Sequence, residues 1–382
     1  MYLKFKNNYI KKTALHIYNY NYFCIMETIT PYDDNIQNIL NEVHNYQHQY
    51  HNSLTPRSLI NDTIISPSVE PSSTIDHPNP FANTSSISSS KKRAFVTLTY
   101  AQSIDGSIAT GKGYQTSISC PESLRMTHDL RTIHEGILIG IGTLLADNPS
   151  LTARLATPRK RQIYDSINPT IIIKEELVSI AHPQPIILDP YFAIPLTCKL
   201  LNDIRCRKPI IIILQSYYDK HIDKQQDIDI YTKYKTIIDK GARIYSVPAF
   251  PTVSPLPDSS PKEMVDLYTT MELLYEKEQL YNVMVEGGAN ILSHYFYQHS
   301  VGTSSSSSSS SSIIEKYNTP LIHCILITIA PILIPGGLRI PYPTISNTTI
   351  NNNTSSSSAP IFSLAASKWL PVGKDMIIVG HL

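Results

Sequence analysis

The sequence predicts an α/β fold in which a largely parallel sheet is flanked by helices. Short apolar runs rich in β-branched residues recur along the chain, and such runs are typical of buried strands. Helix-length stretches separate them, as in strand–helix–strand units with parallel strands. At Gly140 and at Gly287 a predicted strand ends in glycines, where the backbone can approach a ligand closely.

Composition narrows the classes of function. The net charge of +1 over 382 residues gives no electrostatic case for nucleic acid or an anionic membrane surface. No apolar run reaches the ~18 residues of a membrane span. The five cysteines are scattered without a CxxC pair, which indicates neither a metal site nor a disulfide framework. We therefore expect a cytoplasmic protein that binds a small molecule.

Residues 1–90 are expected to be a largely disordered extension of a domain that covers 91–382. Thr30–Tyr50 has helical spacing of apolar residues, whereas Ser53–Ser90 is too rich in Ser, Thr, Pro and Asn to form a core. The acid-free start, Met1–Cys24, leaves mitochondrial targeting open, although it lacks arginine. Within the domain we expect low-complexity or surface insertions near 155–183, 250–262, 300–314 and 343–360.

The domain begins with a β-branched and aromatic strand, Ala94–Tyr100, which leads into small and polar residues and an Asp105-Gly106 turn. This segment is either a hairpin or the floor of a pocket. A helix is predicted to follow, with Ser119 as its cap, Pro121 in its first turn and Arg131 near its end. Arg131 is either solvated or a phosphate ligand.

The stretch Gly136–Arg154 combines a buried strand, Ile137–Ile139, with polar side chains and a terminal arginine. Thr143, Asp147 and Asn148 can hydrogen-bond a ligand, and Pro149 stops any helix. The pattern suits a phosphorylated ligand above a sheet edge. An ordinary strand-to-turn connection explains the stretch about equally well.

Later segments continue the alternation of strands and helices. Strands are predicted at Pro185–Asp189, Pro209–Leu214, Ala242–Val247, Leu321–Ile329 and Lys374–Val379, and a helix at Met264–Gln279. Val283–Val285 forms a strand that ends in Glu286, two glycines and the start of a helix. Such a turn presents free N–H groups at the positive end of a helix dipole and suits a phosphate, unless it is only a helix entry.

Three segments together resemble the riboflavin-pathway reductase family: FVTLTYAQSIDGSIA, LRTIHEGILIGIGTLLADNPSLTAR and VMVEGGAN. The chain is similar also to the reductase domain of bacterial deaminase-reductases and, more remotely, to dihydrofolate reductase. The resemblance spans about Arg93–Leu382 without the insertions. The deaminase half is missing, since no HxE motif with a downstream PCxxC occurs.

The resemblance implies a dihydrofolate-reductase-like fold, an NADPH-dependent reduction and a phosphorylated pyrimidine substrate. It assigns Glu286 and Asp105 as catalytic candidates without choosing between them. The cofactor candidates it implies are Thr143, Asp147, Gly287, Gly288, Ala289, Asn290 and Ala101. The substrate candidates are Ser119, Arg131, Leu151, Arg154 and Ser103. No metal is implied.

Other functions stay open at this point. A dihydrofolate-reductase-like pterin reductase, an inactive nucleotide-binding relative and a low-complexity interaction protein each fit part of the sequence. We also expect a homodimer that uses the C-terminal strands, because apolar terminal strands such as Leu321–Ile329 need cover and closed two-fold dimers are common.

Overall fold

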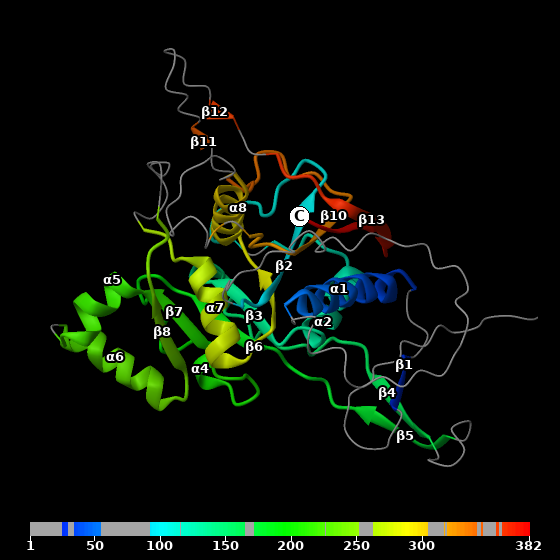
Figure 1. The fold of residues 1–382 in the computed structure, drawn as a ribbon, viewed down its shortest axis with the longest axis horizontal. Coiled ribbons are helices and arrows are strands. Elements are labelled where there is room, and N and C mark those ends of the chain that lie inside the picture. Colours follow the sequence, from blue (N-terminus) through cyan, green and yellow to red (C-terminus); the bar gives the residue numbers. More distant parts are fainter. Residues whose placement is uncertain are drawn as a thin grey trace, which may run out of the picture.

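The computed structural model describes residues 25–29, 34–54, 92–114, 116–164, 172–225, 227–251, 263–304, 317, 319–341, 345–346, 357–358 and 361–382. Its centre is a nine-stranded sheet with the order β13-β14-β10-β2-β9-β3-β6-β7-β8 (Figure 1). The strands are β2 (Phe95–Ser103), β3 (Gly136–Gly140), β6 (Gln184–Leu188), β7 (Ile210–Leu214), β8 (Arg243–Val247), β9 (Asn282–Glu286), β10 (Cys324–Ala330), β13 (Ala365–Val372) and β14 (Asp375–His381).

The pairing confirms the predicted parallel sheet. The strands from β10 to β8 run parallel to their neighbours, while β14 and β13 add an antiparallel hairpin at one side. Each apolar run that the sequence assigned to a strand forms one. Among the nine strands of this sheet, β13 alone was not predicted, because its side chains are mostly exposed and show no apolar pattern.

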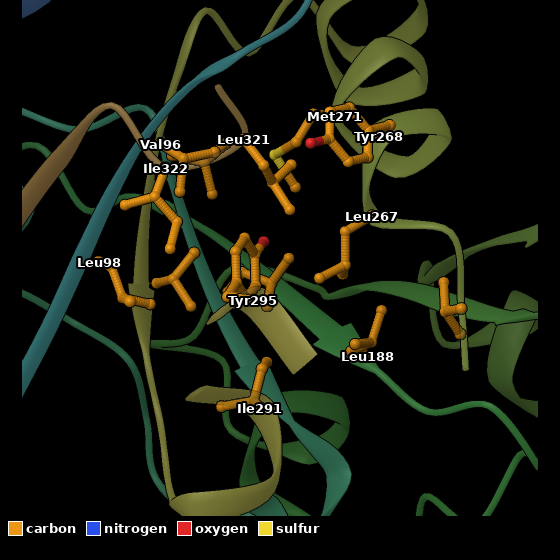
Figure 2. Packing of buried hydrophobic residues seen from close by; sticks show 14 of the residues in the cluster. Val96, Leu98, Leu188, Leu267, Tyr268, Met271, Ile291, Tyr295, Leu321 and Ile322 are labelled. Carbon is orange, nitrogen blue, oxygen red and sulfur yellow. The ribbon is translucent and has the colours of Figure 1, made fainter. Parts of the chain in front are cut away.

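Helices cover both faces of this sheet. On one face, α7 (Leu267–Glu278) and α8 (Ala289–Ser304) pack over alternate residues of β2, β9, β3, β6 and β7. Tyr268 and Tyr295 are fully buried in this layer, and Figure 2 shows Tyr295 among Leu188, Leu267 and Ile291. The remaining strand side chains point to the other face, because successive side chains of a strand alternate.

The second face carries two adjoining clusters. Over β3, β6 and β7 lie α3 (Ile141–Asp147), α4 (Lys199–Asn202), α5 (Gln215–Tyr218), a π-helical turn η2 (Asp219–Asp223) and α6 (Ile228–Asp239). Over β2, β9, β10 and β14 lie α1 (Asp34–Ser53) and α2 (Pro121–Thr132). The two clusters meet where Ile137 of β3 lies in register with Met284 of β9.

The N-terminal helix belongs to this core. A helix was expected over Thr30–Tyr50, and α1 begins at Asp34, while residues 30–33 lie outside the described part. Ile39 and Val43 are fully buried in the cluster that contains Phe95 and Leu326. α1 therefore packs on the same sheet as the residues from 92 onward, because its apolar side covers one face of that sheet.

Most of the region after Arg154 was expected to be a surface insertion, and part of it forms two strands. β4 (Arg159–Tyr164) and β5 (Ile172–Val178) form an antiparallel hairpin, and β4 also pairs with β1 (Ile25–Ile29). This small sheet lies apart from the main one (Figure 1). A further short pair, β11 (Ile345–Ser346) and β12 (Ser357–Ser358), lies within the expected insertion near 343–360.

Two finer expectations are also corrected. Cys120, not Ser119, is the N-cap residue of α2, because the Cys120 N–H donates to Asp375 Oδ2 at 2.8 Å and fixes the start of the helix there. The strands β10 and β14 are interior, since β13 pairs with β14 and covers it. The polyserine run after Ser304 and the loop at 252–262 lie outside the described residues.

Candidate active site

The candidate site lies at the carboxyl ends of β2, β9 and β3, which are consecutive in the sheet. Thr99 of β2 is in register with Glu286, the last residue of β9, and Leu138 of β3 is in register with Val285. Because parallel strands end at one edge, the two glycine-terminated strands and the Asp105 turn meet there, as their sequences indicated.

Arg131 and Glu286 form the central contact of this site. Arg131 Nε donates to Glu286 Oε1 at 2.8 Å and Nη2 donates to Oε2 at 2.7 Å, while Nη1 donates to the Thr152 carbonyl at 2.9 Å. Both side chains are largely buried, at 11% and 19% exposure. Three of the five guanidinium N–H groups are thus occupied by protein, and two remain for a ligand.

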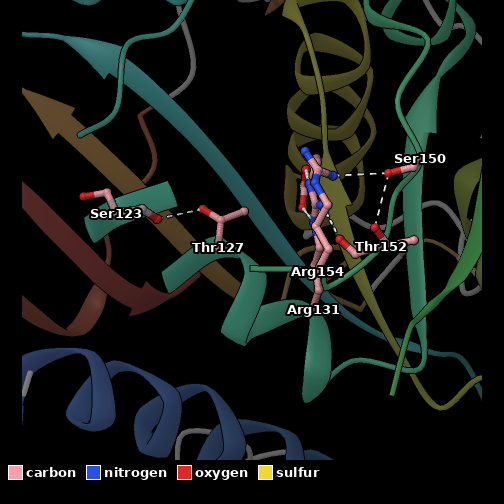
Figure 3. Close-up of polar contacts among 7 residues, drawn as sticks. Ser123, Thr127, Arg131, Ser150, Thr152 and Arg154 are labelled. Carbon is pink, nitrogen blue, oxygen red and sulfur yellow. Dashed lines mark hydrogen bonds and ion pairs between the residues drawn. The ribbon is translucent and has the colours of Figure 1, made fainter. Parts of the chain in front are cut away.

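A loop after α3 brings a second arginine to the same place. Arg154 Nη1 donates to Ser150 Oγ at 3.2 Å, and Ser150 Oγ lies 3.2 Å from Thr152 Oγ1 (Figure 3). Leu151, buried at φ 51°, anchors the loop in the core beneath. The two arginines are linked through Ser150 Oγ, Thr152 Oγ1 and the Thr152 carbonyl, and together they form a site suited to an anion.

Two buried histidines lie close to the arginines. Burial, together with the charges of Arg131 and Arg154, lowers the pKa of His128 to about 4. Burial also lowers the pKa of His134 to about 4, although its ring lies 2.7 Å from the Leu130 carbonyl and 2.8 Å from Thr97 Oγ1. Both rings are therefore neutral at physiological pH, and neither adds charge to the anion site.

The glycine turn after β9 meets α3. The Gly288 N–H donates to Thr143 Oγ1 at 3.3 Å, so two predicted cofactor residues, 145 positions apart, are in contact. A Cβ on Gly287 would overlap Ile291 Cγ2, which shows why no side chain fits there. Behind this turn, Ala289 and Asn290 begin the 16-residue helix α8, whose first N–H groups favour a phosphate.

Other candidates flank this turn. Asp147 ends α3 half-buried, and its burial raises its pKa. Asn148 is the left-handed C-cap of α3, and its side-chain oxygen accepts the Lys199 N–H at 2.8 Å. This oxygen was expected to bind a ligand, but it stabilises the fold instead. Ser119 lies half-buried, two residues before α2. Its backbone position is set by Cys120 and not by a capping bond of its own.

Asp105 lies at the far side of the site, in the turn after β2. Its carboxylate accepts Ser103 Oγ at 2.6 Å and the Ile334 N–H at 3.0 Å. The hydrogen bond from Ser103 is the largest cause that lowers the Asp105 pKa, followed by the bond from Ile334. Ala101 and Ser103 precede it on β2, and both face the same side as Thr99 and Glu286.

The structure adds residues that the sequence did not single out. Ser150 and Thr152 join the two arginines, and His128 lies one helical turn before Arg131. Polar residues spaced by two in a loop carry no signal until the loop is folded, so no pattern could have found them. Among the described residues, no group of three His, Cys, Asp or Glu side chains could hold a metal. None of their helices is both long and apolar enough to cross a membrane.

Comparison with known proteins adds a family. The family described as RibD C-terminal domain matches residues 94–301. The 2,5-diamino-6-ribosylamino-4(3H)-pyrimidinone 5′-phosphate reductase of Saccharomyces cerevisiae is 32% identical over 52% of this chain and 64% of its own length. The enzymes of that name from Candida glabrata and Archaeoglobus fulgidus are 36% and 27% identical, over 41% and 55% of this chain and 62% and 77% of their own.

Two solved structures also align with the chain. A riboflavin biosynthesis reductase of Saccharomyces cerevisiae aligns with 76% of this chain and 90% of its own, at 23% identity and a TM-score of 0.44. RibD of Acinetobacter baumannii aligns with 76% of this chain and 58% of its own, at 18% identity and a TM-score of 0.45. The chain spans less than two thirds of the first two curated relatives.

Proposed function

The chain belongs to the RibD C-terminal domain family, and from that premise we propose that it reduces 2,5-diamino-6-ribosylamino-4(3H)-pyrimidinone 5′-phosphate to its ribitylamino product with NADPH. The names of the curated relatives support this substrate. The observation that carries the proposal is the adjacency of two anion sites, because Arg131 binds the last residue of β9 and Gly288, two residues later, binds Thr143.

One of the two anion sites would bind the substrate and the other the cofactor. Arg154 and the two free N–H groups of Arg131 would hold the 5′-phosphate of the substrate, since guanidinium donors match phosphate oxygens. The turn at Gly287 and Gly288, with Thr143 and the start of α8, would hold the pyrophosphate of the dinucleotide. The residues fit such a group, because the turn leads directly into the N-terminus of α8, whose first N–H groups favour a phosphate.

NADPH supplies the hydride when bound, and the protein supplies orientation and electrostatics. The substrate sugar must open to an imine before C1′ can accept a hydride. As the ring opens, the bond from C1′ to the ring oxygen breaks, the exocyclic N–H gives up its proton and the ring oxygen gains one. Glu286, held by Arg131, would carry the proton between these two atoms. Arg131 keeps that carboxylate fixed in place, and the phosphate anchored by Arg154 keeps the sugar beside it.

The decisive experiment follows NADPH oxidation at 340 nm with the ribosylaminopyrimidine phosphate and identifies the product by mass. The expected result is a product two mass units heavier than the substrate, formed in step with NADPH consumption. Dihydrofolate is the control substrate and should not support oxidation. Turnover of dihydrofolate alone, or no turnover of either compound, would contradict the proposal.

A further inference from the structure

Two loops at the carboxyl ends of β2 and β10 are joined into one unit, which we call the paired exit loops: 104–109 and 331–338. The pairing of Ser103 with Ala330 ends the two strands, yet hydrogen bonds continue beyond it. The Ile104 N–H donates to the Ile332 carbonyl at 3.0 Å. Farther out, the Ile108 N–H donates to the Leu338 carbonyl at 2.7 Å, and the Leu338 N–H donates to the Ala109 carbonyl at 2.8 Å.

The Asp105 carboxylate lies inside this unit and accepts from both loops. Besides Ser103 Oγ from its own strand, it accepts the Ile334 N–H of the opposite loop. Ser107 Oγ lies 3.2 Å from Asp105 Oδ2 and 3.1 Å from the Ile334 carbonyl, and Arg339 Nη2 lies 3.9 Å from Oδ2. Each described neighbour of Asp105 is thus a donor or a cation, which favours the ionised form.

A second feature shows how closely the loops pack. A Cβ on Gly337 would lie 2.8 Å from the Ala109 carbonyl oxygen and 2.8 Å from Ser107 Cβ. These atoms are backbone or the root of a side chain, so they cannot move aside without separating the loops. The contact between the two loops therefore depends on both residues: Gly337 allows the close approach, and Asp105 accepts a hydrogen bond across it.

We propose that Asp105 is a positioning residue that fixes the paired exit loops as one wall of the active site, and that it takes no part in proton transfer. The inference deepens the proposed function and rests on it. A carboxylate whose hydrogen bonds all favour its charged form is a poor acid near neutral pH.

The wall matters because Ala101 and Ser103 are the residues that lead into it. Ser103 is held by its loop through three contacts: its N–H donates to the Ser107 carbonyl, its Oγ accepts the Ser107 N–H, and its Oγ donates to Asp105. Without the Asp105 carboxylate, Ser103 Oγ loses this acceptor and the Ile334 N–H of the opposite loop loses its partner, so the end of β2 becomes mobile. Small displacements of positioning groups lower turnover strongly.

Three variants test this inference. Asp105→Asn keeps an acceptor for Ser103 and Ile334 and has no titratable group, so kcat should stay within about threefold of wild type with an unchanged pH profile. Asp105→Ala and Gly337→Ala should each lower kcat by at least about tenfold. Both should also speed amide hydrogen exchange at Ile334 and Leu338. Asp203→Asn, in an exposed loop where Asp203 binds Arg205, is the matched control and should change nothing.

The outcomes separate cleanly. An Asp105→Asn variant as impaired as Asp105→Ala, with one limb of its pH profile missing, would show that Asp105 transfers a proton. If Gly337→Ala does not fold, Ser107→Ala replaces it, since Ser107 Oγ contacts both loops. Wild-type protein without NADPH oxidation would refute the proposed function, whereas unchanged exchange in Asp105→Ala would refute the joining of the loops.

Discussion

Arg131 and Glu286 are joined by two hydrogen bonds of 2.8 and 2.7 Å, although 155 positions separate them in the sequence. The pair connects the last turn of α2 to the end of β9. It also places one negative charge next to a site that is expected to bind a phosphate. Arg131 is therefore both a structural partner and a ligand-binding group, while Arg154 is exposed and bound only to a hydroxyl in the described structure.

The two arginines should accordingly differ in mutation. Arg154→Ala should weaken substrate binding by roughly 2–3 kcal/mol, the scale of a lost charge-assisted hydrogen bond, with little change in stability. Arg131→Ala should weaken binding similarly and also lower the melting temperature, because Glu286 loses its partner. Calorimetric titration with substrate and with NADPH measures both affinities. Arg125→Ala, on the exposed side of α2, is the control. If either variant binds NADPH poorly and the substrate normally, the arginines belong to the cofactor site and not to the substrate site.

The glycine turn makes a separate prediction. Gly287→Ala should lower both the melting temperature and the NADPH affinity, because its Cβ would overlap Ile291 Cγ2 at the entry of α8. Gly288→Ala should leave stability nearly unchanged, since the nearest atom to its Cβ is Thr143 Oγ1 at 3.7 Å. Fluorescence titration with NADPH and thermal unfolding of both variants check this. Equal loss of stability in the two would argue against the packing explanation.

Stability should fall in acid because of His134. Its folded pKa of about 4 lies below the usual value of 6.5, so the unfolded chain binds the proton more readily. The contribution is fully present above pH 6.5 and is lost as the pH falls toward 4, by roughly 3 kcal/mol. Urea unfolding at pH 7 and pH 4.5 measures the difference. In His134→Asn the pH dependence should be smaller, and in the exposed control His48→Asn it should be unchanged.

The N-terminal helix should be needed for stability. Ile39→Ala removes a fully buried side chain from the cluster over β2 and β10, and should lower the free energy of unfolding by roughly 2–4 kcal/mol. The control is Asn38→Ala on the exposed side of α1. A chain that begins near residue 92 should lose more unfolding free energy, since the sheet face that α1 covers becomes exposed to water. Unchanged urea midpoints for both would mean that the helix is dispensable.

The oligomeric state is still a prediction, and the structure relocates its interface. With β10 and β14 interior, the free edge on that side is β13, where Trp369 is 62% exposed. We predict a homodimer that pairs these edges. Light scattering after size-exclusion chromatography should give about twice the 42.8 kDa chain mass, and Trp369→Lys should halve it. A wild-type mass equal to that of one chain would contradict the prediction. Ile204→Lys, at an exposed position outside β13, is the control.

Much of the fold could be predicted because its strands are apolar on both sides. Runs such as Pro209–Leu214 can hardly be anything but central strands of a covered sheet. β13 escaped prediction because an exposed edge strand with a lysine and a proline has no apolar pattern. The pairing of β4 with β1 escaped prediction because β1 lies far earlier in the chain, so no local signal indicates it.

For the site, the sequence could indicate residue types but not partners. Glycines after apolar strands predicted where ligands would approach, and Gly288 does contact Thr143. The same reasoning could not show that Arg131 is paired with Glu286, or that Asp105 accepts the Ile334 N–H, because these contacts cross 155 and 229 positions. Long-range polar contacts depend on the finished topology, which no local pattern contains.

The order of strands in the sheet has a consequence for how the chain is made. β2 is the first strand of the main sheet to leave the ribosome, yet both of its neighbours, β9 and β10, are translated only after β3, β6, β7 and β8. Until then both edges of an apolar, β-branched strand stay unpaired. Such non-local pairing makes folding slow and exposes nascent chains to aggregation. Production in a heterologous host should therefore depend on chaperones and on growth temperature more than the stability of the finished protein suggests.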